Sequence, residues 1–133
     1  MTQLLTEPTL TINEHGTHDW RLNGVHHRLD GPARIWSKPY NGEEWIVNGR
    51  YHRVGGPARI FQESGQYWYV NGELHRVDGP AWLPPEHGWW KESRRWYVHD
   101  HHITDKIEAW MAAKDVSWPW DESTQVEFCL TWC

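Results

Sequence analysis

One stretch of fourteen residues recurs three times in this chain. It reads WRLNGVHHRLDGPA from Trp20, WIVNGRYHRVGGPA from Trp45 and WYVNGELHRVDGPA from Trp68. A degraded fourth copy begins at Trp96, so the four tryptophans are 25, 23 and 28 residues apart. Spacings of this size are typical of stacked supersecondary units that contact mainly their neighbours. Because a catalytic site is normally written once and a structural unit many times, the recurrence predicts a repeat protein and argues against an enzyme.

The conserved letters of each copy are turn signals. An Asn-Gly pair between strand-like residues is the strongest short signal for a hairpin, because both turn positions need positive φ. The later Gly-Pro corner must end one strand and begin another, since proline cannot donate to a β-ladder. We therefore predict a mainly β fold, a single curved antiparallel meander of tandem hairpins. The positions to which we assign structural roles are Asn23, Gly24, Asn48, Gly49, Asn71, Gly72, Asp30, Asp78, Pro32, Pro57 and Pro80.

The segment after the repeats has a different pattern. Thr104 is suited to cap a helix over residues 105–115, whose apolar residues follow at helical spacing. Beyond Pro119, apolar residues alternate at period two, which predicts a short strand. The alternating residues are Val126, Phe128, Leu130 and Trp132.

These patterns predict one domain in two parts. The first part, residues 1–104, contains the hairpin repeats, and the second, residues 105–133, is a helix-and-strand cap that closes the exposed end of the stack. The repeats lie near residues 20–36, 45–61 and 68–83, with the degenerate copy at 96–104.

Composition narrows the function classes. The net charge of −5 argues against sequence-independent nucleic-acid binding and against anionic membrane surfaces. No stretch approaches the roughly 18 apolar residues of a membrane span, and the first ten residues lack a secretory signal pattern. Cys129 and Cys133, four positions apart on one element, are poorly placed for a disulfide. We expect a cytoplasmic protein, in the host cytoplasm if it is viral.

The recurring W-x-V-N-G-x-x-H-R-x-D-G-P-A resembles a MORN-type repeat, and more closely the variant found in tandem in tailed-phage and giant-virus proteins. The resemblance extends over about residues 9–104. It implies a curved sheet of hairpins that binds other proteins or, in some members, lipid head groups, with no shared chemistry. On this basis we expect a non-enzymatic protein-binding module, a small phage accessory protein that binds and inhibits a host or defence component.

Motifs for catalysis are missing from the sequence. It contains no nucleophile elbow, Walker loop, H-E-x-x-H helix or Cys-x-x-Cys pair, so we assign no catalytic residue, cofactor or metal. The equivalent histidines His27, His52 and His75 should lie two strands apart, about 10 Å at the usual strand spacing, too far for one metal to reach two of them. We expect each of these rings to hydrogen-bond within its own corner.

A cluster of histidines in the fourth copy is the better metal candidate. Imidazole is the commonest zinc ligand, and His99, His101 and His102 are close in sequence. Strand alternation, however, would point His102 away from the other two. The sequence leaves metal binding by this cluster open.

The arginine that follows each repeated histidine says more about function than the histidine does. Either it pairs with the aspartate two residues later or its stem packs on tryptophan. In the middle copy Gly55 replaces that aspartate, which leaves Arg53 without its partner in the repeat. An arginine without a carboxylate is well shaped to bind a carboxylate or phosphate from outside. We predict that Arg53 and the adjacent His52 contact an acidic ligand.

The insert at residues 83–96, LPPEHGWWKESRRW, departs from the repeat period. Irregular loops on a regular scaffold are where binding residues concentrate, and Trp and Arg dominate interface hot spots. Our further partner-binding candidates are therefore Trp89, Trp90, Arg94 and Arg95, with packing of the two tryptophans on the sheet as the alternative.

Two other functions remain open at this point. Tryptophan stacking together with the arginines suits a small anionic ligand such as a nucleotide. A sheet edge near residues 9–12 would also allow pairing with another copy of the chain, which suits a self-assembling structural protein or homo-oligomer.

Overall fold

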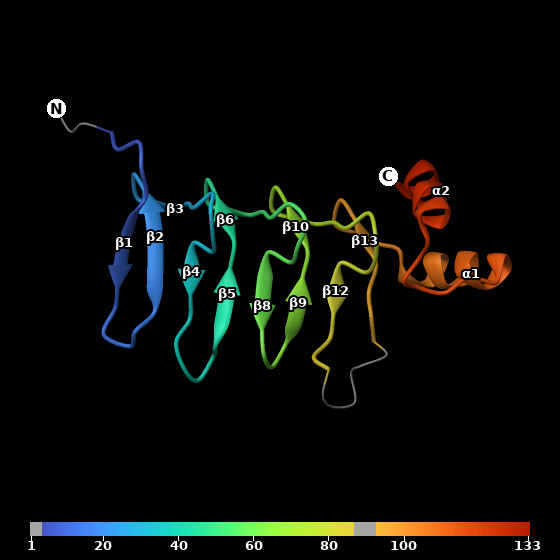
Figure 1. Ribbon diagram of the computed structural model, residues 1–133, viewed down its shortest axis with the longest axis horizontal. Coiled ribbons are helices and arrows are strands. Elements are labelled where there is room, and N and C mark those ends of the chain that lie inside the picture. The colour runs from blue at the N-terminus through green and yellow to red at the C-terminus, as the bar shows by residue number, and fades with distance from the viewer. Residues whose placement is uncertain (1–3, 87–92) are drawn as a thin grey trace.

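The computed structural model describes residues 4–86 and 93–133. The protein is a row of antiparallel hairpins along the long axis of the molecule, with two helices at its C-terminal end (Figure 1). The first strand, β1 (Thr9–Ile12), lies at the opposite end of the row. The mainly β meander followed by a C-terminal helix, predicted from the sequence, is confirmed.

The main sheet has eight strands in the order β1-β2-β4-β5-β8-β9-β12, with β3 paired to β2. Neighbouring strands are antiparallel throughout, so the chain runs up and down along the row. The strand bounds are β1 Thr9–Ile12, β2 His18–Leu22, β3 Val25–His26, β4 Arg34–Ile35, β5 Gly42–Glu44, β8 Arg59–Phe61, β9 Gly65–Tyr67 and β12 Trp82–Leu83.

From the second unit onward, the hairpins at the turns are ladders of their own rather than parts of one sheet. They lie along one side of the row of main-sheet hairpins (Figure 1). Their strands are β6 Ile46–Val47 with β7 Arg50–Tyr51, β10 Tyr69–Val70 with β11 Glu73–Leu74, and β13 Tyr97–Val98 with β14 His101–His102. The single sheet that we expected is therefore divided at Trp45, Trp68 and Trp96, where the ladder is interrupted, but not at Trp20, which lies inside β2.

The tryptophans that begin the first three units close those units through the backbone. The N–H of Trp68 donates to the carbonyl of Ala81 at 2.7 Å, and the carbonyl of Trp68 accepts the N–H of His75 at 3.0 Å. Trp20 and Trp45 make the equivalent two bonds in their own units. The start of each hairpin is thus fastened to the corner that ends it.

The turns have the left-handed backbone that the Asn-Gly signal predicts. Asn48 and Gly49 have φ of 50° and 77°. In the degraded fourth copy, His99 and Asp100 adopt φ of 46° and 64°, a region that side chains disfavour. The Asp100 carboxylate accepts the backbone N–H of Leu74 at 2.6 Å, which helps to hold this turn. The fourth copy therefore keeps its hairpin without the Asn-Gly pair.

Helix α1, Thr104–Lys114, matches the helix predicted at 105–115. Thr104 does not cap it, because the N-cap is Ile103, which makes no side-chain capping bond. Instead, Thr104 Oγ1 accepts the backbone N–H of Trp96 at 3.0 Å. The threonine fastens the helix to the fourth copy rather than starting it.

The strand predicted near residues 126–132 is wrong, because this segment lies in helix α2, Glu122–Trp132. Asp121 is its N-cap, and the carboxylate accepts the N–H of Thr124 at 2.7 Å, a bond that also lowers the pKa of Asp121. The alternating apolar residues do not share one buried face: Phe128 is fully buried, whereas Leu130 is 84% exposed.

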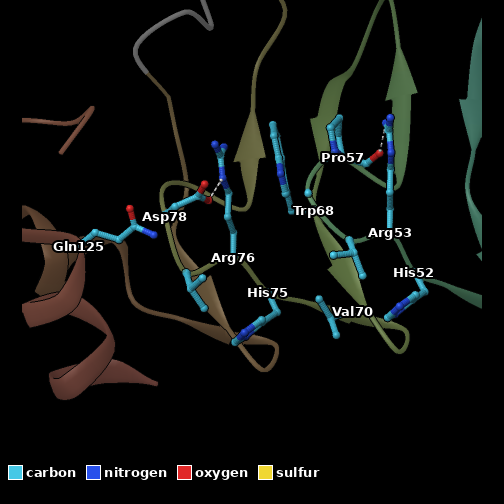
Figure 2. Close-up of a pocket in the computed structure, with 13 residues that line it drawn as sticks. His52, Arg53, Pro57, Trp68, Val70, His75, Arg76, Asp78 and Gln125 are labelled. Atoms are coloured by element: carbon cyan, nitrogen blue, oxygen red, sulfur yellow. Dashed lines mark hydrogen bonds and ion pairs between the residues drawn. The ribbon is translucent and has the colours of Figure 1, made fainter. Parts of the chain in front are cut away.

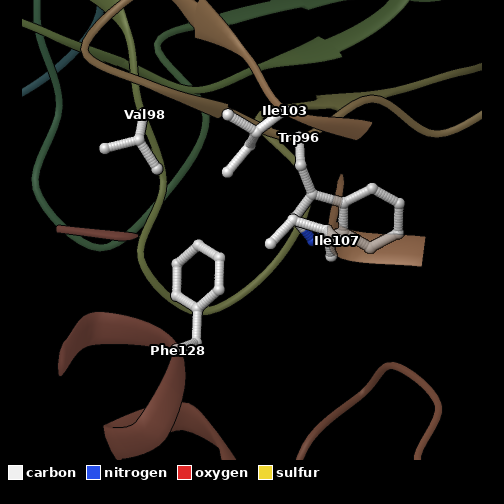
Figure 3. Packing of buried hydrophobic residues seen from close by; sticks show 5 residues of the cluster. All are labelled: Trp96, Val98, Ile103, Ile107 and Phe128. Atoms are coloured by element: carbon white, nitrogen blue, oxygen red, sulfur yellow. The ribbon is translucent and has the colours of Figure 1, made fainter. Parts of the chain in front are cut away.

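The hydrophobic core lies where the cap meets the fourth copy (Figure 3). Its buried members are Trp96, Val98, Ile103, Ile107 and Phe128. The cap also contacts the third unit, where the indole N–H of Trp118 donates to the carbonyl of Asp78 at 2.9 Å. The two helices therefore close one end of the row.

Candidate binding groove

The repeated histidines tie neighbouring units together. We expected each ring to hydrogen-bond within its own corner, which is wrong: each Nδ1 accepts a backbone N–H from the turn of the next unit. The donors and acceptors are Asn48 and His27 at 3.0 Å, Asn71 and His52 at 3.1 Å, and His99 and His75 at 3.1 Å. Only an unprotonated Nδ1 can accept, so this geometry requires a neutral ring.

His75 is the histidine whose environment most clearly favours the neutral form. Burial lowers its pKa from the ordinary value, the nearby His99 ring lowers it further, and Glu73 opposes the change. The two rings are tilted against each other with centroids 4.2 Å apart. The tie between the third and fourth units therefore depends on a ring that resists protonation.

The repeated arginines share one pose. Each guanidinium lies over the tryptophan ring of its own unit and donates through Nη1 to the proline carbonyl four residues later. The stacking distances are 4.0 Å for Arg28 on Trp20, 3.8 Å for Arg53 on Trp45 and 3.9 Å for Arg76 on Trp68. The corresponding bonds to Pro32, Pro57 and Pro80 are 3.2, 3.0 and 3.1 Å. These contacts fix the guanidinium planes within the fold itself.

The glycine that precedes the proline of each corner makes room for the arginine. A Cβ at Gly31 would lie 2.7 Å from Cζ of Arg28, and one at Gly56 would lie 3.0 Å from Cζ of Arg53. Both separations are shorter than ordinary contacts. The guanidinium is therefore packed between the indole ring and the glycine backbone, and a Cβ at this position would displace it.

The three arginines differ in their carboxylate partners. Nε of Arg28 donates to Asp30 at 3.1 Å, and Nε of Arg76 donates to Asp78 at 2.7 Å, so these local charge pairs are present as expected. Gly55 occupies the matching position in the second unit, with φ of 79°. Among the residues that the structure describes, no carboxylate lies within salt-bridge distance of Arg53.

A groove of about 450 Å³ lies between the corners of the second and third units. Arg53 and Arg76 stand on its two sides with Trp68 between them (Figure 2). Gln125 reaches the groove from α2, and His52 lines it near the turn (Figure 2). The sequence had selected His52 and Arg53 for a ligand contact, and the structure brings both into one hollow.

The groove also offers apolar surface that the sequence reasoning missed. Val54 is 86% exposed at the rim, and Val70 and Val77 line the hollow in half-buried positions. The available signal was the position between the arginine and the corner, which is aliphatic in all three copies although it follows a charged residue. The wall contributed by Gln125 had no comparable signal, because α2 was mistaken for a strand.

Of the four candidates from the insert, the structure describes only the two arginines, which contact separate rings. Trp89 and Trp90 lie outside the described residues. The guanidinium of Arg94 lies 5.4 Å from the ring centroid of Trp118, and that of Arg95 lies 5.2 Å from the ring centroid of Trp82. These two arginines therefore contact different rings of the same chain.

The three histidines of the fourth copy are engaged separately. The His99 ring packs on His75, while Nδ1 of His101 lies 3.3 Å from the carbonyl of Val98. His102 contacts Thr104 Oγ1 at 2.7 Å. Within residues 4–86 and 93–133, no group of three or more His, Cys, Asp or Glu side chains is placed to hold a metal ion.

A buried acidic residue in the first unit also escaped the sequence reasoning. Asp19, 8% exposed, lies 2.9 Å from Nε2 of His26 and 2.8 Å from Nε of Arg34. The second unit repeats the pair as Glu44 and Arg59 at 3.4 Å. The acid before the tryptophan and the arginine after the Pro-Ala corner were visible as a repeated pair. Because their charges are satisfied within the sheet, we assign them a structural role.

Comparison with protein-family models, with curated proteins and with solved structures finds no match to this chain. The MORN-type resemblance therefore stays a prediction. None of the helices among the described residues combines the length and the apolar character needed to cross a bilayer.

Proposed function

We propose that this protein is a non-enzymatic binding module that holds a segment of a protein partner in the groove between the second and third units. The observation that supports this most directly is the departure of the second unit from its neighbours. The same corner that replaces aspartate with Gly55 borders the groove and carries Arg53, which pairs with no carboxylate among the residues that the structure describes.

The surroundings of the groove suit a polypeptide segment. A fixed cation at Arg53 lies beside the exposed Val54, and the Trp68 ring lies between the two arginines (Figure 2). Interfaces combine such aromatic and arginine anchors with apolar contact around them. The row of hairpins is fixed by backbone bonds between units, so little ordering of the scaffold is needed on binding.

Photo-crosslinking compares the groove with a matched position elsewhere. Benzoyl-phenylalanine replaces either Val54 or Leu29, which is the equivalent residue of the first unit and is 76% exposed. In a lysate of the cell in which the gene resides, we expect one discrete cross-linked protein from position 54 and none from position 29. Equal yields from the two positions would contradict a site in the groove.

A more specific version follows from the resemblance alone: a small phage accessory protein that blocks a host or defence component. This version requires that the protein cross-linked at position 54 comes from the host and loses activity when bound. A cross-linked phage structural protein would replace it with an assembly role.

Self-association is a second candidate, supported by the outer strand β1. β1 ends the main sheet, and its apolar residues Leu10 and Ile12 are 44% and 58% exposed. Unpaired edge strands can pair with a second chain. Sedimentation over a range of concentrations tests this, since Leu10→Lys should abolish any dimer. A monomer at the highest concentration would remove this candidate.

A further inference from the structure

We infer that the groove binds the carboxylate of an aspartate or glutamate side chain, which takes beside Arg53 the place that Asp30 and Asp78 take beside their own arginines. This inference rests on the proposed function and names the chemical group that the site recognises. The central contact is a hydrogen bond from Nε–H of Arg53 to the ligand carboxylate. The groove around Arg53 indicates which residue should lie next to that carboxylate in the ligand.

The chain itself supplies the template for this contact. Arg28 and Arg76 have the same stack on tryptophan and the same Nη1 bond to a proline carbonyl as Arg53. In both units the Nε–H then donates to an aspartate, at 3.1 and 2.7 Å. The second unit repeats the donor but has Gly55 in place of the acceptor. A carboxylate from outside completes an arrangement that the fold makes twice on its own.

Arg53 is held ready for this contact. The indole of Trp45 at 3.8 Å and the carbonyl of Pro57 at 3.0 Å fix the guanidinium on two sides. A long arginine side chain ordinarily loses rotamer freedom when it binds, and here the fold has already restricted that freedom. A charge-assisted bond to a fixed guanidinium is also stronger than one between neutral groups.

The charge balance favours a carboxylate over phosphate. Arg76 on the facing side is paired with Asp78, and Nδ1 of His52 and of His75 accepts a backbone N–H, so among the described lining residues Arg53 provides the one unbalanced charge. A single positive charge matches a carboxylate, whereas a phosphate monoester carries about two negative charges at neutral pH. Asp78 across the groove would also repel the second charge of a phosphate.

The residue beside the acid is expected to be aliphatic. Val54 is the exposed neighbour of Arg53, and Val70 and Val77 supply further apolar surface in the groove. A partner side chain that covers these groups adds apolar burial to the charge contact. An acid followed by an aliphatic residue is therefore the simplest ligand that uses both features.

Titration of the ¹⁵N-labelled protein with short peptides tests the contact at the atom concerned. The reporters are the Nε–H resonances of Arg28, Arg53 and Arg76, assigned by their loss in the three Arg→Gln variants. With acetyl-Asp-Val-amide we expect a saturable shift of the Arg53 resonance and no matching shift of the other two. Acetyl-Asn-Val-amide should leave the chemical shifts of all three Nε–H resonances unchanged.

Other outcomes of the titration overturn the inference. No shift of Arg53 up to the solubility limit of the Asp peptide, or equal shifts of all three arginines, means that the second unit has no special acceptor site. A larger shift with inorganic phosphate than with the Asp peptide replaces the carboxylate with a phosphate ligand.

Two substitutions exchange the properties of the units. Gly55→Asp should place an internal carboxylate beside Arg53 and abolish the response to the Asp peptide, whereas Gly55→Asn should retain it. Asp and Asn both tolerate positive φ, so the pair shares the strain of replacing a glycine at φ 79°. Conversely, Asp30→Asn should make the Arg28 resonance responsive. If Gly55→Asp still responds and Asp30→Asn does not, the inference fails.

The failure of this inference is distinguishable from failure of the proposed function. A protein that cross-links at position 54 equally well with and without Arg53→Gln would leave the groove as a binding surface and remove the carboxylate contact. A saturable Arg53 shift with no cross-linked protein would leave the contact and remove the role as a protein-binding module.

Discussion

The repeat units and the cap are stabilised in different ways. The cap and the fourth copy bury large apolar side chains, including the fully buried Ile107 and Phe128. In the first three units, the fully buried side chains include the small ones of the Pro-Ala corners, Ala33, Ala58, Pro80 and Ala81, and the tryptophan rings are only partly covered by arginine. The units therefore depend on backbone bonds and close backbone packing, which leaves their larger side chains at the surface for binding.

Truncation in the cap should have the largest effect on stability. Phe128→Ala removes a fully buried ring and should lower the free energy of unfolding by about 3–5 kcal/mol. Leu130→Ala, on the same helix but 84% exposed, should change it by less than about 0.5 kcal/mol. Urea denaturation measures both. Similar losses for the two variants would show that α2 does not pack as described.

Glycine substitutions test the close backbone packing of the units. A Cβ at Gly65 would lie 2.1 Å from the carbonyl oxygen of Leu83, whereas one at Gly24 would meet nothing within 4 Å. Both glycines have positive φ, at 97° and 84°, which alone costs an alanine about 1–2 kcal/mol. We expect Gly65→Ala to cost about 1–3 kcal/mol more than Gly24→Ala in the same denaturation measurement. Equal costs would mean that the backbones are not so close.

The histidine ties should make the units sensitive to acid. The pKa of His75 is lowered in the folded protein, so the unfolded chain binds more protons near neutral pH. Its contribution to stability is fully present above the unfolded pKa of about 6.5 and is lost as pH falls through the lowered pKa.

His75→Leu provides the control for this pH dependence. It leaves the N–H of His99 without its acceptor and should cost about 1 kcal/mol at neutral pH. The difference in unfolding free energy between wild type and variant should shrink below pH 6.5. A difference that stays constant or grows on acidification would contradict the tie.

The exposed ion pair of the first unit should matter least for stability. Asp30 is 88% exposed, and such pairs contribute about 0–1 kcal/mol. We expect Asp30→Asn to shift the thermal unfolding midpoint only slightly. A large shift of the unfolding midpoint would mean that Asp30 contributes to packing. Asp30→Asn would then be a poor variant for the peptide titration.

Local signals were sufficient for much of the fold. The Asn-Gly pairs predict the hairpin turns because they favour positive φ at two adjacent residues. The helical spacing of apolar residues after Thr104 predicts α1. The strand predicted at Val126 failed because its alternation coincided with a helix, while Asp121 as a capping residue was the signal that was overlooked. The histidine ties were not predictable from local pattern, since each acceptor ring meets a backbone donor 19 to 24 residues away.

The candidate site was predictable only in part. A difference between near-identical copies, Gly55 for aspartate, pointed to Arg53 without any knowledge of the structure. To predict the opposite side of the groove, one must know the distance between adjacent units and the path of α2 toward Gln125. Both are tertiary properties. Comparison among copies therefore indicates which residue is unusual, and the structure indicates what surrounds it.

The most direct measurement compares Arg53→Gln with Arg28→Gln for both stability and binding. Both substitutions remove a stack on tryptophan and a bond to a proline carbonyl, so we expect similar losses of unfolding free energy, about 1–2 kcal/mol each. Cross-linking from position 54 should be lost only with Arg53→Gln. If the two variants reduce cross-linking equally, the second unit is not a binding site distinct from its neighbours, and if neither reduces it, Arg53 makes no contact with the partner.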